Sequence, residues 1–455
     1  MTAVALVGGT LPVPPLLQPT LDKDVLVFPL QMATGSTEVL PGVASPTAGF
    51  NGAFLGPTMR ILERQKVRFS VTNNLAEETT VHWHGLHIAP SMDGGPQNII
   101  AAGTTWSPQF TVKQSQSCTL WYHPHGLGTT ARQVSLGLAG MIIVDSPSPA
   151  SASLPRDYGR DDFPLIMQST AVLADGSLAQ NNGGFTAAGS TLQLLVNGAS
   201  ATAATPTLSV DRGRVRLRLL NASLVDTITV ARADGAAVTQ VASDAGLLAA
   251  PLSVTSVRLV HGERAEILLD LTTGTTVTLQ ATVQNAVNAV RYTVPLVAVS
   301  TTSPPGPLLP PLPPTLNVIT PLATTNALTR TLTLNNNGAI QMINGIAGTS
   351  ITTLHDNMIM TGLNDIEVWD VVNATAALHH SFHLHDVPYQ VISINGVAAS
   401  GVNLGWKDTI EVPPGATVKI AMQFTDFTDT EYMYMLHCHN LVHEDAGMML
   451  GLMVN

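Results

Sequence analysis

The sequence is poor in charged residues, aromatic residues and cysteine. Charged residues make up 11% and aromatic residues 5% of the 455 residues, and Cys118 and Cys438 are the two cysteines. Two cysteines cannot build a disulfide framework. No uninterrupted apolar run approaches the ~20 residues that span a bilayer, so we expect a soluble protein without a membrane span. The net charge of -11 argues against a nucleic-acid partner.

Two further stretches carry no clear functional signal. The amino-terminal stretch MTAVALVGGTLPVPPLL lacks a basic region and an A-x-A-like site, so it is not a clear signal peptide. The one basic cluster alternates with apolar residues and comprises Arg212, Arg214, Arg216 and Arg218. Alternation places these side chains on one face of a strand, which we expect to be solvated.

Long helical periodicity is also rare, and strand-like alternation broken by Gly, Pro or Asn takes its place. This pattern is typical of β-sandwiches. A proline-rich stretch at 301–316 predicts a linker, and DSPSPASASLP at 145–155 marks a weaker boundary. We therefore expect domains at 1–150, 151–300 and 317–455.

An internal repeat supports three domains. Each segment contains an Asn-Gly pair followed by an alternating strand that ends in Asn; the pairs begin at Asn51, Asn197 and Asn344, and the strands lie at 67–74, 215–223 and 366–375. A repeat of this length indicates copies of one structural unit. The sequence thus predicts an all-β protein of three similar sandwiches.

Most of the fourteen histidines gather in four clusters: HWHGLH (82–87), HPH (123–125), HHSFHLH (379–385) and HCHNLVH (437–443). In the first and third segments, His-x-His pairs fall at matching places: His82 and His84, His123 and His125, His383 and His385, His437 and His439. The middle segment has only His261, so we expect it to be a spacer without metal ligands.

His-x-His spacing puts both rings on one face of a strand, so four such pairs can bring eight imidazoles to a cleft between two domains. Neutral imidazoles without carboxylates suit copper better than calcium or magnesium. Chance clustering could explain one pair, but it is a poor explanation for four pairs in register.

Cys438 lies between two of these histidines and must therefore face the other side of its strand. His380 is an odd number of residues from His383, so it also points away from the cleft. His443 and Met448 follow on the next loop. One thiolate, two imidazoles and one thioether form the ligand set of a blue-copper site.

The motifs HWHG, WYHPH, H-x-x-H-x-H and HCH-x3-H-x4-M, in this order, resemble the four copper motifs of the multicopper oxidases, nearest the bacterial laccase and copper-efflux oxidase branch. The resemblance implies three cupredoxin-like Greek-key β-sandwich domains and four copper ions. It assigns a type 1 copper to His380, Cys438, His443 and Met448, a type 2 copper to His82 and His383, and two type 3 coppers to His84, His123 and His439 and to His125, His385 and His437. The family usually has proline where this chain has Ser381, and His379 is an additional histidine.

The resemblance also implies an activity. We expect a laccase-type enzyme that takes electrons from phenols or aromatic amines through an exposed His443 and Cys438, and reduces dioxygen to water. Asp93 and Glu444 occupy positions that supply protons in the bacterial branch, whereas we expect Asp408 and Asp445 to be structural. We further expect a monomer in the periplasm or outside the cell.

Other readings remain open at this point. A cuprous oxidase is the main alternative, although the region before the third motif contains only Met358 and Met360 and no methionine-rich insert. A copper-free structural member of the family, of the cell-division type, would lose the ligands that this chain retains. A simple electron carrier would leave eight histidines without a role, and a two-domain nitrite reductase would be shorter.

Overall fold

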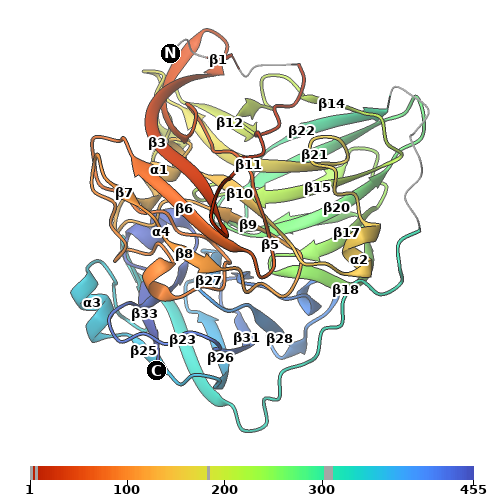
Figure 1. Ribbon diagram of the computed structural model, residues 1–455. Coiled ribbons are helices and arrows are strands. Elements are labelled where there is room, and N and C mark those ends of the chain that lie inside the picture. Colours follow the sequence, from red (N-terminus) through yellow and green to blue (C-terminus); the bar gives the residue numbers. More distant parts are fainter. Residues whose placement is uncertain (1–3, 6–8, 182–184, 302–310) are drawn as a thin grey trace.

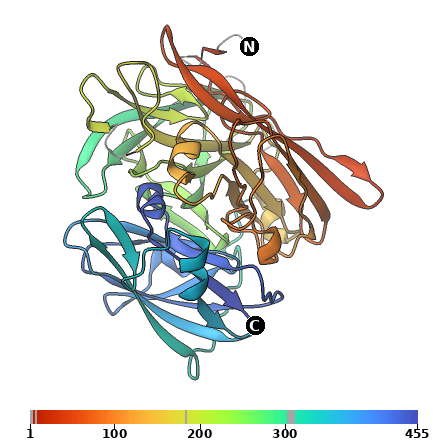
Figure 2. The ribbon, with the colours of Figure 1, turned by 90° about the vertical axis from the view of Figure 1, so that its left-hand side faces the viewer.

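The computed structural model describes residues 4–5, 9–181, 185–301 and 311–455. Within these ranges the strands form six sheets, which pack as three pairs (Figures 1 and 2). This arrangement confirms the predicted all-β fold of three sandwiches. Most of the proposed linker, at 302–310, and parts of the amino-terminal stretch, at 1–3 and 6–8, lie outside the described residues.

The first sandwich pairs a seven-stranded sheet with a three-stranded sheet. Its elements are β1 (Val4–Ala5), β2 (Thr20–Asp22), β3 (Val25–Leu40), β4 (Val43–Phe50), β5 (Met59–Leu62), β6 (Lys66–Asn73), η1 (Pro90–Met92), β7 (Thr105–Trp106), β8 (Gln109–Thr111), β9 (Cys118–Tyr122), α1 (Thr130–Ser135) and β10 (Gly140–Asp145). Phe28, Phe69 and Trp83 are fully buried between the sheets, and the Cys118 thiol is buried in the same core.

The second sandwich pairs sheets of seven and five strands. Helix α2 (Pro149–Ser153) precedes β11 (Asp162–Val172), β12 (Thr191–Val196), β13 (Ala199–Ser200), β14 (Thr207–Val210), β15 (Arg214–Asn221), β16 (Thr227–Arg232), β17 (Val238–Ser243), β18 (Gly246–Val254), β19 (Ser256–Leu259), β20 (Arg264–Asp270), β21 (Thr276–Gln284) and β22 (Val290–Thr301). Its core contains Leu217, Ile267 and Val299.

The third sandwich pairs sheets of six and five strands. It comprises β23 (Leu328–Asn337), β24 (Ile340–Ile343), α3 (Ile351–Asp356), β25 (Ile359–Thr361), β26 (Ile366–Asn373), β27 (His380–Leu384), β28 (Tyr389–Ile394), β29 (Val397–Ala398), η3 (Gly401–Leu404), β30 (Thr409–Val412), β31 (Thr417–Gln423), β32 (Tyr434–Cys438), α4 (Leu441–Asp445) and β33 (Met449–Val454). Trp369, Phe382 and Leu436 lie in its core, together with Cys438.

The sequence repeat corresponds to a repeat of hydrogen bonds. Asn51, Asn197 and Asn344 all have positive φ, at 56°, 50° and 54°, which Asn tolerates better than most residues. The side-chain oxygen of each accepts a backbone N–H from the neighbouring long strand, at Gln31, Ile166 and Thr333 respectively. The Asn-Gly turns therefore fasten equivalent strands in all three sandwiches.

The asparagines at the strand ends also repeat. Asn73, Asn221 and Asn373 are fully buried, and each donates from its side-chain amide to two backbone carbonyls. A buried amide needs such partners, because an unpaired polar group costs about 1–3 kcal/mol. The same buried asparagine contact therefore occurs in all three cores.

The basic cluster on β15 departs from the sequence prediction. Arg216 and Arg218 are only 2% and 1% exposed, so the expected solvated face is wrong for these two residues. Arg218 donates to Asp162 and Glu266 of its own sandwich and to the Thr119 hydroxyl on β9. The reason is tertiary: the first sandwich packs on this part of the strand, and paired carboxylates compensate the buried charges. Among the described residues, no helix is long and apolar enough to cross a membrane.

Candidate metal centres

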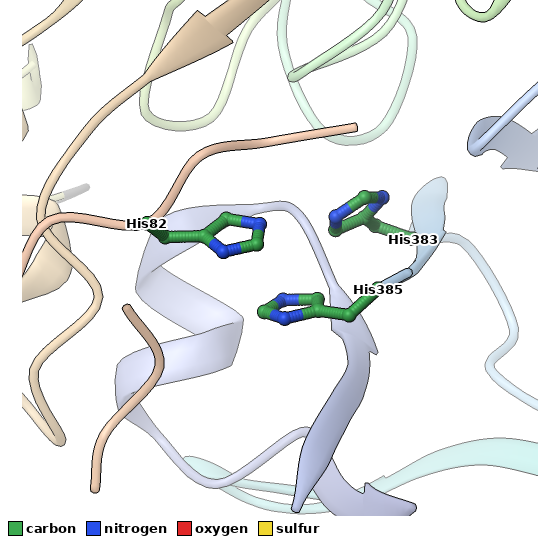
Figure 3. Close-up of side chains that lie close together, drawn as sticks. All are labelled: His82, His383 and His385. Carbon is green, nitrogen blue, oxygen red and sulfur yellow. The ribbon is translucent and has the colours of Figure 1, made fainter. Parts of the chain in front are cut away.

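The four His-x-His pairs meet between the first and third sandwiches. His82 and His123 face each other in a β-bridge, and His383 pairs with His437 between β27 and β32. All eight rings are buried, with exposures of 0–1%. The ring centroids of His82 and His385 lie 3.8 Å apart, and those of His84 and His383 lie 3.7 Å apart. Figure 3 shows His82 pointing across the domain boundary toward His383 and His385.

Several sets of three side chains come close enough to hold a metal ion, with ligand atoms within 4.8 Å of one another. One set matches a predicted type 3 ligand group: the Nε2 atom of His437 lies 3.1 Å from that of His125 and 3.3 Å from that of His385. Further sets are His82 with His383 and His385, His82 with His84 and His123, and His84 with His383 and Asp408. His439 lies beside His84 and His123, at ring-centroid distances of 5.0 Å and 5.3 Å.

The chemistry of these donors fits copper. Burial lowers the pKa values of His84, His123, His383, His385 and His439 well below the usual value, so these rings are neutral near pH 7. Several inward nitrogens have no hydrogen-bond partner among the described residues: His82 Nε2, His84 Nδ1, His123 Nε2, His383 Nε2 and both nitrogens of His439. Buried imidazole nitrogens with free lone pairs are suited to a metal such as copper.

Hydrogen bonds to the outer nitrogens hold the rings in position. His82 Nδ1 lies 2.9 Å from the Asp93 carbonyl oxygen, and His383 Nδ1 lies 2.8 Å from that of Asp408. A metal-binding histidine commonly donates its second N–H in this way, which fixes the tautomer. Arg264, from the middle sandwich, forms a two-point ion pair with Asp408 beside His84. Arg264 thus holds Asp408 against His84, and the structural role of Asp408 stays a prediction.

Two other carboxylates reach the cluster. Asp93 and Glu444 are each 1% exposed. Asp93 Oδ2 lies 2.6 Å from His385 Nδ1, and Glu444 Oε2 lies 3.1 Å from His437 Nδ1. Each of the two proposed proton donors is therefore separated by a single imidazole ring from the space between the inner nitrogens.

Local structure explains how these carboxylates are placed. Next to Asp93, Gly94 has φ +80°, and a Cβ there would lie 1.7 Å from the Val81 carbonyl oxygen, so only glycine allows this turn. Glu444 lies in α4, whose N-cap Asn440 accepts two backbone N–H groups. Asp445 accepts the N–H groups of Thr130 and Ala131 in α1, which is the predicted structural role.

A separate set of candidate ligands lies inside the third sandwich. His380 Nδ1 is 3.4 Å from Cys438 Sγ and 3.2 Å from His443 Nδ1, and His443 Nδ1 is 3.8 Å from the sulfur. Met448 is buried in the same core, and its backbone oxygen accepts the Cys438 N–H. Burial raises the pKa of the Cys438 thiol to about 12, so a cation would be needed to hold the thiolate near pH 7.

The exposure of His443 differs from the prediction. Its side chain is buried, with 7% exposure, because α4 packs against α1 and the middle sandwich through Leu441. The other three proposed type 1 ligands are 0% exposed, so His443 still has the most solvent contact of the four.

The remaining histidines all lie outside the ligand sets. His355 is exposed on α3, and His379 pairs with Glu411. His87 bridges Asp386 and Asp426 of the third sandwich. His261 is buried against Ser381. The middle sandwich therefore supplies no ligand to these sets, but it contacts them through His261 and Arg264, which the sequence alone did not indicate.

Three sandwiches with a buried cysteine-histidine site and an interdomain histidine cluster define a copper protein of the cupredoxin type. Residues 31–149 and 312–455 each match the multicopper oxidase family. The chain is 32% identical to multicopper oxidase mco from Staphylococcus aureus, over 96% of this chain and 90% of that protein. It is 33% identical to the cell division protein FtsP of Yersinia pestis, over 96% and 90%.

Solved structures agree with these relatives. A laccase-like multicopper oxidase CueO from Ochrobactrum sp., described as active on lignin model compounds and lignosulfonate, superposes with a TM-score of 0.86 at 29% identity, covering 98% of this chain and 100% of that one. The chain therefore belongs to the multicopper oxidase family. Membership implies copper cofactors and an oxidoreductase that uses dioxygen as acceptor.

Proposed function

We propose that the protein is a laccase-type oxidase of phenols and aromatic amines that reduces dioxygen to water with four copper ions. The observation that carries this proposal is the presence of both ligand sets: His380, Cys438 and His443 in one sandwich, and eight buried imidazoles at the domain boundary. Bound copper would accept electrons singly at the first site and deliver four of them to dioxygen at the second.

The chain itself would connect the two sites. Cys438 would hold the type 1 ion while its neighbours His437 and His439 face the cluster, so a covalent path of one residue joins the centres. His443 is the ligand with the most solvent contact, and we infer that electrons enter there. Asp93 and Glu444 lie against cluster histidines and would supply protons, because each is within 3.1 Å of a ligand ring.

The proposed substrate class rests on two points. No methionine-rich insert precedes the third motif, and one relative acts on lignin model compounds. Phenols and aromatic amines need contact with the protein rather than coordination, whereas incoming Cu(I) selects thioethers. The described residues do contain a methionine cluster that no local sequence pattern marks: Met433, Met435, Met449 and Met453 pack with Leu354. All four are at most 5% exposed, so they line a core rather than an open copper-binding surface. The CueO structure named above also supports aromatic donors.

Turnover of a methoxyphenol and of Cu(I), measured side by side with copper content and oxygen uptake, tests this function. We expect four copper ions per chain and phenol oxidation without added copper. Phenol oxidation that requires excess copper would make the protein a cuprous oxidase. In the same preparation, size-exclusion chromatography and cell fractionation test the proposed monomer and the proposed periplasmic or extracellular location.

A copper-free structural role is the second candidate, because the similarity to FtsP is as extensive as that to mco. The buried unpartnered nitrogens argue against it, since they would cost stability without a metal to bind. Absence of bound copper after growth in copper-supplemented medium would favour this candidate.

A further inference from the structure

Arg264 lies at the start of β20 in the middle sandwich, where all three sandwiches meet. Its side chain is buried, with 1% exposure. A guanidinium has five N–H groups, and each of those of Arg264 donates one hydrogen bond. The acceptors, at 2.5–3.1 Å, are the carbonyl oxygens of Thr119, Gly262 and Asp244 and both carboxylate oxygens of Asp408. Thr119 belongs to the first sandwich and Asp408 to the third, so this one side chain joins three domains.

The backbone of the first sandwich also approaches this ion pair closely. Gly85, which ends the HWHG motif, has φ +88°. A Cβ at this position would lie 2.8 Å from Asp408 Oδ2 and 3.0 Å from Arg264 Nη2. A larger residue would therefore push the ion pair away from the histidines of the motif, besides straining the backbone. Glycine at this position allows the first sandwich to close onto the pair.

Asp408, which Arg264 holds, contacts one histidine from each half of the cluster. His84 Nε2 lies 3.1 Å from Asp408 Oδ1, and His383 Nδ1 lies 2.8 Å from the Asp408 carbonyl oxygen. Arg264 Nη1 also lies 3.1 Å from His84 Nε2, but a guanidinium only donates, so Asp408 is the nearest acceptor for a proton on this nitrogen. The lone pairs then lie on His84 Nδ1 and His383 Nε2, which have no hydrogen-bond partner among the described residues.

We propose that Arg264 is a positioning residue that holds Asp408 and, through it, fixes the tautomers of two cluster histidines. In this arrangement the free nitrogens of His84 and His383 face the proposed copper cluster. Hydrogen-bond partners of this kind orient metal-binding histidines, and their loss typically lowers metal affinity by about 10–100-fold. The middle sandwich thus contributes to the cluster without supplying a ligand. The inference rests on the copper cluster proposed above.

Arg264→Met in the full-length protein tests this inference. Copper content after competition with a chelator reports affinity, blue absorption reports the type 1 site, and electron paramagnetic resonance reports the cluster. We expect the cluster to bind copper about 10–100-fold more weakly. The type 1 site should keep its copper, because its ligands lie inside the third sandwich. Asp408→Asn should show the same pattern, and the double variant should lose no more affinity than the more affected single variant if Arg264 acts through Asp408.

Arg218→Met is the matched control. Arg218 is also 1% exposed and also bonds to Thr119, but its carboxylate partners are Asp162 and Glu266 of the middle sandwich. This variant should lose stability and keep the wild-type copper affinity of the cluster. Wild-type affinity in Arg264→Met, or an equal loss in Arg218→Met, would overturn the inference. If Arg264→Met does not fold, wild-type affinity in Asp408→Asn would overturn it. A wild-type protein that binds no copper at the cluster would instead refute the proposed function.

Discussion

Replacing Arg218 with Met should destabilise the protein strongly, although a sequence-based view places Arg218 on a solvated strand face. Its guanidinium is 1% exposed and bonds to Asp162 at 2.7 Å and to Glu266 at 2.9 Å. Burial would lower the pKa of Arg218, but these carboxylates raise it, so the group is charged. Removing one partner of a buried ion pair typically costs about 3–5 kcal/mol, because the other charge remains buried.

Arg214→Met is the matched control on the same strand face. Arg214 pairs with Asp270, whose side chain is 67% exposed, so this pair should contribute only about 0–1 kcal/mol. For an unfolding unit of 150–250 residues, each kcal/mol of lost stability lowers the thermal midpoint by roughly 2–4 °C. Arg218→Met should therefore lower the midpoint by about 10 °C, and the control should lower it by no more than a few degrees. Differential scanning calorimetry measures both. Equal midpoints for the two variants would refute the claim that this network stabilises the domain boundary.

Three further predictions concern the metal centres and their surroundings. Cys438→Ser should abolish the blue absorption and oxidase turnover while circular dichroism stays that of a β protein, because the thiolate gives the colour; a blue variant would contradict the assignment. Glu444→Gln should slow dioxygen reduction but not type 1 reduction in stopped-flow experiments, because it removes a proton donor without removing a ligand; unchanged reoxidation would show that protons arrive elsewhere. His87 is largely buried, which would lower its pKa, but Asp386 and Asp426 raise it, so the stability it contributes is complete below about pH 6.5 and is lost as pH rises through the raised value. The thermal midpoint of His87→Asn should therefore fall less than that of wild type between pH 6 and 9; equal slopes would exclude this role.

The sequence was sufficient to group the histidine pairs because strand alternation is local. The i and i+2 spacing of His437 and His439 determines that both rings share a face and that Cys438 takes the other face. The repeated asparagines were visible for the same reason, since a turn and a strand end are each encoded by a few consecutive residues. These features required no knowledge of how the sandwiches pack.

What the sequence could not provide was the packing between sandwiches. Arg216 and Arg218 show the alternation of a solvated face, yet part of that face is covered by the first sandwich. Exposure of His443 was overestimated for the same reason, because α1 lies against its helix. The contacts of His261 and Arg264 join residues more than a hundred positions apart, and no local pattern marks them.

The division of the histidine cluster between two sandwiches also sets an order of events during synthesis. His125 and His437 touch across a separation of 312 residues. At about 5–20 residues per second, a ribosome needs about 15 to 60 s to make the intervening chain. During that time the first sandwich can fold but carries only half of the interdomain ligands. The proposed cluster can therefore be completed only after the last sandwich has been made and has docked, and a chain truncated before residue 437 would lack proposed ligands of both centres.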